Sequence, residues 1–188
     1  MTITNKSTVF AGELGFVDIY HTPVKLTGEN EVSYYLFGVL DTCTQIVWVE
    51  VIEETEALTL MFASLKCFTI FSDYYNIKFK GIKASKAFNG VSNDVSDANT
   101  PFERLLNEQN ILHHNSGDSE SPRPITNLVK GFWDSIYDDL LKDTCIENKK
   151  SLKQKIVDYL YYYNEKRVHE KLKGMTPNEF NKECFRHI

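Results

Sequence analysis

The chain has 188 residues, of which 42% are hydrophobic and 13% aromatic, and it carries a net charge of -5. This composition excludes a disordered tail protein, and the length favours one domain because two full domains would have small cores. No apolar run approaches the roughly 20 residues of a membrane helix and no signal-peptide pattern opens the chain, so we expect a soluble intracellular protein, nuclear or cytoplasmic.

The charge is unevenly distributed along the chain. Residues 146–188 hold 10 Lys and Arg against 6 Asp and Glu, whereas residues 1–145 hold 11 against 20. Only the C-terminal segment therefore offers a basic face to phosphates, although a solvated helical surface explains the same charges. The candidate nucleic-acid-binding residues are Lys150, Lys153, Lys166, Lys171 and Lys173.

The four cysteines stand far apart, at Cys43, Cys67, Cys145 and Cys184. They form no CxxC pair. We predict buried free thiols and no structural zinc site.

The N-terminal part of the chain predicts a three-stranded meander. Residues 14–24 are rich in β-branched and aromatic side chains, which is typical of a strand. Residues 32–41 and 44–52 have the same character and are joined by a very short turn. Because a short turn joins antiparallel neighbours, these segments should pair with each other.

A helix and a fourth strand should follow the meander. Thr55 is the candidate N-cap. Leu58, Phe62, Leu65 and either Phe68 or Thr69 recur at helical spacing, which predicts that they form the buried face of the helix. Residues 76–84 then predict the fourth strand.

The rest of the chain predicts mainly helices. In order we expect a loop at 89–100, a helix at 101–110, a short strand at 111–114, a loop at 116–124, and helices at 125–142, 150–167 and 176–185. This order is that of the ribonuclease-H-like fold, an α/β fold with a five-stranded mixed sheet flanked by helices. We expect one domain over residues 1–188, with the sheet and catalytic-type helices in 12–145 and the C-terminal helices in 146–188.

The C-terminal segment YYNEKRVHEKLKGMTPNEF resembles the YNxxRxHxxLxGxTPxE ending of integrase catalytic cores. The nine matching residues are Tyr163, Asn164, Arg167, His169, Leu172, Gly174, Thr176, Pro177 and Glu179. Such cores, members of the DDE transposase superfamily, occur in retroviruses, retrotransposons and bacterial insertion sequences. The resemblance covers nearly the whole chain, and it suggests origin in a mobile element.

The resemblance implies a catalytic site that this sequence has altered. The family uses two aspartates and a glutamate to hold two magnesium ions, which activate a nucleophile for attack on a phosphodiester. Asp18 matches the first aspartate, whereas Lys83 and Lys130 stand where the second aspartate and the glutamate are expected. Ammonium groups repel a cation, so we expect no metal ligands and no cofactor. Our hypothesis is that the lysines form an ion-pair cluster with Asp18, or a weak phosphate cradle.

Two other carboxylates keep an active enzyme among the alternatives. Asp97 precedes Phe102 at the spacing of the second carboxylate, and Asp134 follows Lys130 by one helical turn. The motif implies structural roles for Arg167 and His169, and helical spacing favours Trp133 as a core residue over a base-stacking one.

Two classes of function remain. The first is a catalytically inactive integrase-like domain retained to bind DNA or a protein, with a homodimer expected from the resemblance. The second is an active magnesium-dependent strand-transfer enzyme with rearranged carboxylates. The two lysines favour the first class. The family's flanking zinc-binding and DNA-binding modules are not matched, so we expect one part of a longer protein.

Overall fold

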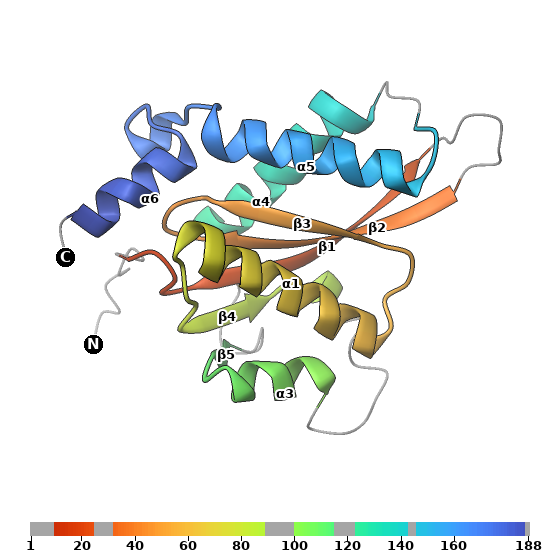
Figure 1. The fold of residues 1–188 in the computed structure, drawn as a ribbon, viewed down its shortest axis with the longest axis horizontal. Coiled ribbons are helices and arrows are strands. Elements are labelled where there is room, and N and C mark those ends of the chain that lie inside the picture. The colour runs from red at the N-terminus through yellow and green to blue at the C-terminus, as the bar shows by residue number, and fades with distance from the viewer. Residues whose placement is uncertain (1–9, 25–31, 89–99, 115–122, 143–145, 187–188) are drawn as a thin grey trace.

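The computed structural model describes residues 10–24, 32–88, 100–114, 123–142 and 146–186. A five-stranded sheet with the strand order β3-β2-β1-β4-β5 lies at its centre (Figure 1). The five strands are β1 (Gly15–Val24), β2 (Val32–Asp41), β3 (Val47–Ile52), β4 (Gly81–Ala84) and β5 (Leu112–His114).

The pairing of the strands confirms the predicted meander. β1 pairs antiparallel with β2, and β2 pairs antiparallel with β3, while β4 is parallel to both β1 and β5. β3 begins later than predicted because Gln45 has a positive φ of 61° in the turn, where its N–H donates to the carbonyl of Asp41 over 2.9 Å. The mixed sheet is thus the predicted one, with a shorter third and fourth strand.

Helices cover both faces of the sheet. The helical segments are α1 (Ala57–Tyr75), α3 (Pro101–Glu108), α4 (Arg123–Ile136), a π-helical turn η1 (Tyr137–Leu141), α5 (Lys149–Glu165), a 3-10 turn η2 (Glu170–Leu172) and α6 (Pro177–Arg186). One hydrophobic core lies between the sheet and α1 and α3, and a second lies between the sheet and α4 and α5. The two cores explain why both faces of the central strands are apolar.

Alternation along β1 decides which face Asp18 occupies. Val17 and Ile19 belong to the core on the side of α1, whereas Phe16 belongs to the core on the side of α4. Since successive side chains of a strand point to opposite faces, Asp18 shares its face with Phe16 and points towards α4.

The predicted buried face of α1 is wrong at Leu58, Phe62 and Leu65, whereas Phe68 is buried as predicted. Leu58, Phe62 and Leu65 are 59%, 56% and 39% exposed. The helix begins after Glu56, whose side chain makes no capping bond, and not after Thr55. Its buried side is the one with Leu60, Ala63, Ser64, Cys67, Phe68, Phe71 and Tyr75. Apolar residues lie around most of this helix, so their spacing did not distinguish the face that packs on the sheet.

Residues of the C-terminal motif hold α5 on the sheet and cap the start of α6. Asn164 is fully buried, accepts a hydrogen bond from the Val47 N–H over 3.1 Å and donates to the Val47 carbonyl over 2.8 Å. Thr176 and Glu179 bond each other's backbone N–H groups at the start of α6, as a capping box does. These motif residues therefore stabilise the fold. None of the helices in the described ranges is long and apolar enough to span a bilayer.

Candidate functional site

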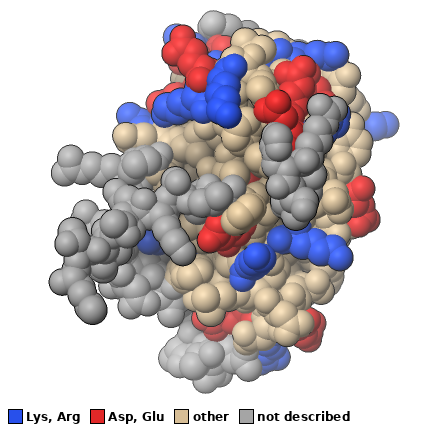
Figure 2. Space-filling model, turned by 90° about the vertical axis from the view of Figure 1, so that its left-hand side faces the viewer, with Lys and Arg blue, Asp and Glu red and all other residues tan. Residues whose placement is uncertain are grey.

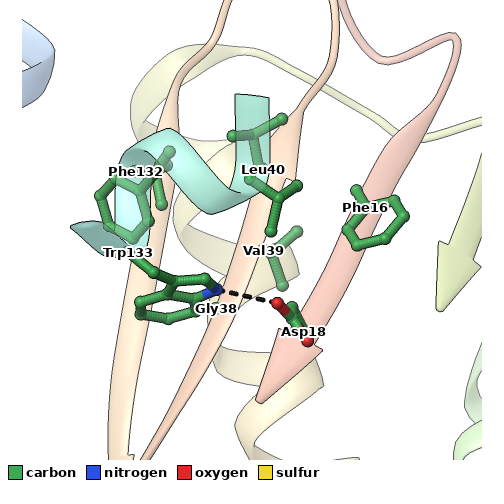
Figure 3. Close-up of a pocket in the computed structure, with 9 residues that line it drawn as sticks. Phe16, Asp18, Gly38, Val39, Leu40, Phe132 and Trp133 are labelled. Carbon is green, nitrogen blue, oxygen red and sulfur yellow. Dashed lines mark hydrogen bonds between the residues drawn. The ribbon is translucent and has the colours of Figure 1, made fainter. Parts of the chain in front are cut away.

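Asp18 lies in the middle of the central strand, under α4 (Figure 3). The indole N–H of Trp133 donates to its Oδ2 over 2.8 Å, and the backbone N–H of Ile19 donates to its Oδ1 over 2.9 Å. The side chain of Ser85 also forms a hydrogen bond with the carboxyl group. Neutral groups thus provide these three contacts of Asp18.

The surroundings of Asp18 favour its neutral form. Burial raises the pKa of Asp18 above its ordinary value, and the hydrogen bonds from Ser85, Trp133 and Ile19 offset only part of that rise. A lysine in contact with the carboxylate would lower the pKa instead. The pKa direction is that of a carboxyl group in an apolar site with neutral donors.

The register of β1 and β4 places Ser85 beside Asp18. Phe16 pairs with Lys83 and Val17 pairs with Ala84, and the Ser85 N–H donates to the Val17 carbonyl over 2.9 Å. Lys83 is on the same face but lies level with Phe16, and it is 8% exposed. The sequence analysis did not identify Ser85 as a neighbour of Asp18. The register between two parallel strands depends on how they pair in the folded sheet, and spacing along the chain does not reveal it.

On α4, Trp133 is the residue that reaches Asp18. Lys130 is exposed one helical turn earlier, whereas Trp133 is 6% exposed and stacks on Tyr20 with ring centroids 5.2 Å apart. A Cβ added to Gly38 would lie 2.9 Å from the indole ring, so the glycine makes room for it. The prediction that Trp133 is a core residue is confirmed.

A small hollow beside Asp18 is nearly filled by these side chains. Its lining residues are Phe16, Asp18, Gly38, Val39, Leu40, Val47, Val129, Phe132 and Trp133. Most of them are apolar, and Asp18 is the acidic residue of the set (Figure 3). The hollow lacks the oxygen-rich lining that a hydrated magnesium ion prefers.

The two alternative carboxylates differ in position. Asp134 is exposed on α4, and its charge contributes to the raised pKa of Tyr20. Asp97 lies in 89–99, outside the described residues. Neither is among the groups described in contact with Asp18.

The groups around Asp18 do not fit the family's pair of magnesium ions. Such ions need several carboxylate or carbonyl oxygens, whereas an indole N–H and an ammonium group are donors only. The Oδ2 atom of Asp18 is already bonded to Trp133. Within the described ranges, no three His, Cys, Asp or Glu side chains are grouped as a metal site would require.

The five candidate DNA-binding lysines lie in two groups. Lys150 and Lys153 are in the first turns of α5, and Lys166 follows its last residue, so about 24 Å separates the two ends at 1.5 Å per residue. Lys171 and Lys173 lie at and just after η2, beyond the same end as Lys166. Figure 2 shows Lys and Arg interspersed with Asp and Glu on the face that it displays.

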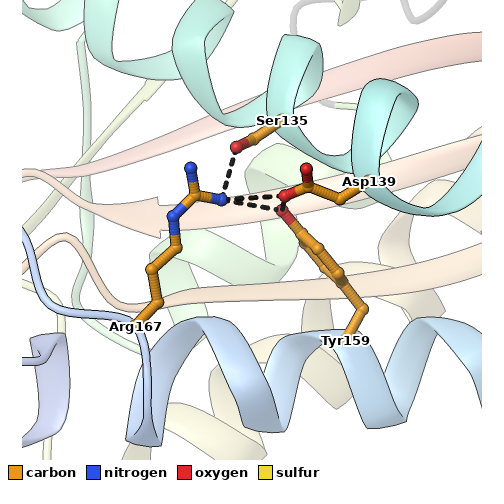
Figure 4. Close-up of polar contacts among 4 residues, drawn as sticks. All are labelled: Ser135, Asp139, Tyr159 and Arg167. Atoms are coloured by element: carbon orange, nitrogen blue, oxygen red, sulfur yellow. Dashed lines mark hydrogen bonds and ion pairs between the residues drawn. The ribbon is translucent and has the colours of Figure 1, made fainter.

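Arg167 connects α4 and η1 to α5 (Figure 4). Its Nη1 donates to Ser135 Oγ over 2.5 Å, to Asp139 Oδ2 over 3.0 Å and to the Tyr159 hydroxyl over 3.3 Å. The Tyr159 hydroxyl also donates to Asp139 over 3.2 Å. The geometry agrees with the structural role that the motif implies for Arg167.

Comparison with known proteins gives a consistent result. Residues 131–185 match a family model described as an integrase core domain. The ORF3 product of Spiroplasma virus SpV1-C74, named as a candidate integrase, is 25% identical over 176 residues, which cover 89% of this chain and 48% of that protein. The chain thus spans about half the length of this curated relative.

Solved retroviral integrases share the fold. The magnesium complex of the HTLV-2 catalytic core, in a dimeric form, has a TM-score of 0.61 at 15% identity and covers 92% of this chain and 98% of that one. The BIV integrase catalytic core has a TM-score of 0.62 at 14% identity, and the match covers 94% of this chain and 97% of the BIV chain. A chain of the simian T-cell lymphotropic virus intasome, solved in complex with the PP2A regulatory subunit B56 gamma, has a TM-score of 0.65 at 12% identity. The match covers 94% of this chain and 56% of that chain.

The ribonuclease-H-like fold class predicted from the sequence is therefore confirmed. The family match, the viral relative and the shared fold together show that the chain is similar to integrase catalytic cores.

Proposed function

We propose that this chain is a catalytically inactive integrase-core-like domain, derived from a mobile element and retained for binding. The hydrogen bond from Trp133 to Asp18 is the observation that carries the proposal. In this arrangement the matching carboxylate holds α4 on the sheet, where the family mechanism needs it to hold a cation. Lys130, on the same helix, adds a positive charge where the family has a glutamate.

Binding of Mn²⁺ tests the loss of the metal site. Free Mn²⁺ has a strong electron paramagnetic resonance signal that falls when the ion binds to protein. We expect the signal to be equal with the wild-type chain and with Asp18→Asn. Binding that is present in the wild type and lost in Asp18→Asn would contradict the proposal, and would make active strand transfer with Asp97 or Asp134 the better reading.

The binding partner that we propose first is a second copy of the chain. Leu58, Phe62 and Leu65 form an exposed apolar stripe on α1, and Val157 and Tyr161 are exposed on α5. The two helices flank the β3 edge of the sheet (Figure 1). The HTLV-2 core, which shares this fold, is described in a dimeric form. Burial of the stripe between two copies would remove apolar surface from water.

Sedimentation analysis tests the dimer. Phe62→Glu should shift the chain to the monomer because it places a charge in the apolar contact. Leu112→Glu is the matched control, since Leu112 is 62% exposed on β5 and away from α1. A wild-type chain that is monomeric at tens of micromolar, or a dimer that survives Phe62→Glu, would contradict this proposal.

DNA is the second candidate partner. The supporting observation is the basic balance of residues 146–188, although its lysines lie in two groups at opposite ends of α5. A gel shift with duplex DNA at low and moderate salt measures this binding. DNA binding by this surface would weaken with salt and with Lys150→Glu and Lys153→Glu together, because phosphate contacts release counterions.

A further inference from the structure

Cys43 and Cys184 come together at one end of the sheet. Cys43 lies in the turn between β2 and β3, and Cys184 lies in α6, 141 positions later in the chain. Their side chains are hydrogen-bonded neighbours. Both are partly exposed free thiols, whereas Cys67 is fully buried on the side of α1 that packs on the sheet. The prediction of buried thiols is therefore wrong for Cys43 and Cys184, and Cys145 lies outside the described residues.

Hydrogen bonds fix the backbone on the Cys43 side. The carboxylate of Asp41 is fully buried and accepts bonds from the Gly12 N–H over 2.9 Å and from the Thr44 N–H over 2.8 Å. It also accepts a bond from the backbone N–H of Cys43. The turn that carries this thiol is thus held to the segment just before β1 by one buried side chain.

The helix that carries Cys184 is anchored equally well. The amide of Asn181 donates to the Tyr75 carbonyl over 2.9 Å, and Asn178 donates to Glu165 over 2.7 Å. Figure 1 shows α6 at the end of the sheet where the turn between β2 and β3 lies. Contact between the two thiols is the first condition for a disulfide between these elements.

We propose that Cys43 and Cys184 are an oxidation site at which a low-molecular-weight disulfide, such as oxidised glutathione, joins the two elements. One cysteine loses its proton to water and attacks a glutathione sulfur, which releases one glutathione as a thiol. The second cysteine loses its proton and attacks the mixed disulfide, which releases the other glutathione. The protein thereby loses two electrons and two protons, and the glutathione disulfide gains them.

The surroundings of the pair disfavour the thiolate form of both cysteines. Burial and the nearby carboxylates of Asp41 and Glu13 raise the pKa of Cys43 to about 12. Burial, Asp41 and Glu183 raise the pKa of Cys184, which Lys173 and the bond to Cys43 lower in part. Because the thiolate is the attacking species, we expect slow exchange and not a reactive catalytic thiol.

Peptide mapping after oxidation tests the site. The reduced full chain is incubated with oxidised glutathione at mildly alkaline pH, blocked with an alkylating agent and digested without a reductant. We expect a linked pair of peptides containing Cys43 and Cys184, with the mass of both peptides less two hydrogens. The oxidised chain should also melt about 5 to 10 °C higher, since the bond closes a very long loop.

Three variants make the result decisive. Cys43→Ser and Cys184→Ser should each abolish the linked peptide and leave a glutathione on the remaining cysteine, whereas Cys145→Ser should leave the link intact. Separate glutathione adducts on Cys43 and Cys184 in the wild type, without a link, would overturn the proposal. So would a link that joins either cysteine to Cys145 or Cys67 instead.

Discussion

Trp133 of α4 and Asp18 of β1 are joined by a hydrogen bond of 2.8 Å between the indole nitrogen and the carboxylate. The bond connects two residues 115 positions apart and lies between the central strand and the helix that covers it. The tryptophan also stacks on Tyr20 and packs against Gly38. Asp18 therefore acts here as the polar anchor of a largely apolar helix–sheet contact.

Trp133→Phe should destabilise the chain by about 1 to 3 kcal/mol, because the partly buried carboxylate of Asp18 loses the indole donor while an aromatic ring is kept. Urea denaturation measures the change. Trp48→Phe is the matched control, since the indole of Trp48 bonds Glu50 over 3.2 Å at a partly exposed position. Equal losses in the two variants would show that the Asp18 bond adds no stability.

Asp18→Asn should change the pH dependence of stability in a defined direction. The folded pKa of Asp18 lies above its ordinary value of 3.8, so the folded state binds more protons than the unfolded chain between the two values. Ionisation of Asp18 therefore lowers wild-type stability as the pH rises through the folded pKa, and below 3.8 this penalty is absent. Asn cannot ionise and avoids the penalty.

Thermal or urea unfolding from acidic to neutral pH measures the difference between the two chains. The variant should gain stability relative to the wild type as the pH rises, and the gain should level off at neutral pH. The opposite trend, a variant that becomes relatively weaker as the pH rises, would indicate a carboxylate in a favourable ion pair. The ion-pair cluster of Asp18 with Lys83 and Lys130 predicts that trend.

Arg167→Ala should cost about 1 to 2 kcal/mol in the free energy of unfolding. One guanidinium nitrogen bonds Ser135, Asp139 and Tyr159, but the partial exposure of the Arg167 and Asp139 side chains, 34% and 47%, reduces the value of the ion pair. Lys166→Ala, next in the chain and exposed, should stay within about 0.5 kcal/mol of the wild type. If Arg167→Ala lowers the free energy of unfolding no more than Lys166→Ala does, the hydrogen bonds of Arg167 do not stabilise the fold.

Substitutions that introduce carboxylates beside Asp18 should create metal binding, and the register of the sheet should decide which position binds more tightly. Ser85→Asp with Lys130→Glu should bind Mn²⁺ about tenfold more tightly than Lys83→Asp with Lys130→Glu, because Ser85 contacts Asp18. Titration calorimetry measures both affinities. If the Lys83 variant binds more tightly, the spacing to Phe88 aligns the family's second aspartate better than the register does.

The overall order of strands and helices could be predicted because each element carries its own local signal. The alternating apolar strands, Pro101 and Pro177 at helix starts, and the nine-residue motif gave the topology and the C-terminal structure. Arg167 was expected to be structural, and its hydrogen bonds to Ser135 and Asp139 agree with that role. Asn164 was matched only as a motif residue, and its two hydrogen bonds to Val47 hold α5 on the sheet.

The features that were predicted wrongly or not at all depend on packing between distant segments. The face of α1 that packs on the sheet combines small side chains such as Ala63 with large ones such as Phe71. Because this helix has apolar residues on several sides, its periodicity does not show which side is buried. Ser85 and Trp133 meet Asp18 only through strand register and helix placement. The same is true of Cys43 and Cys184.

The most direct test of the inactive core is a nicking and strand-transfer assay on labelled duplex DNA with Mg²⁺ or Mn²⁺, with the wild-type chain beside Asp18→Asn. We expect no products from either protein above the level without protein. Products from the wild type that vanish in Asp18→Asn would contradict the proposal, because they would show that Asp18 works with other carboxylates as a catalytic residue.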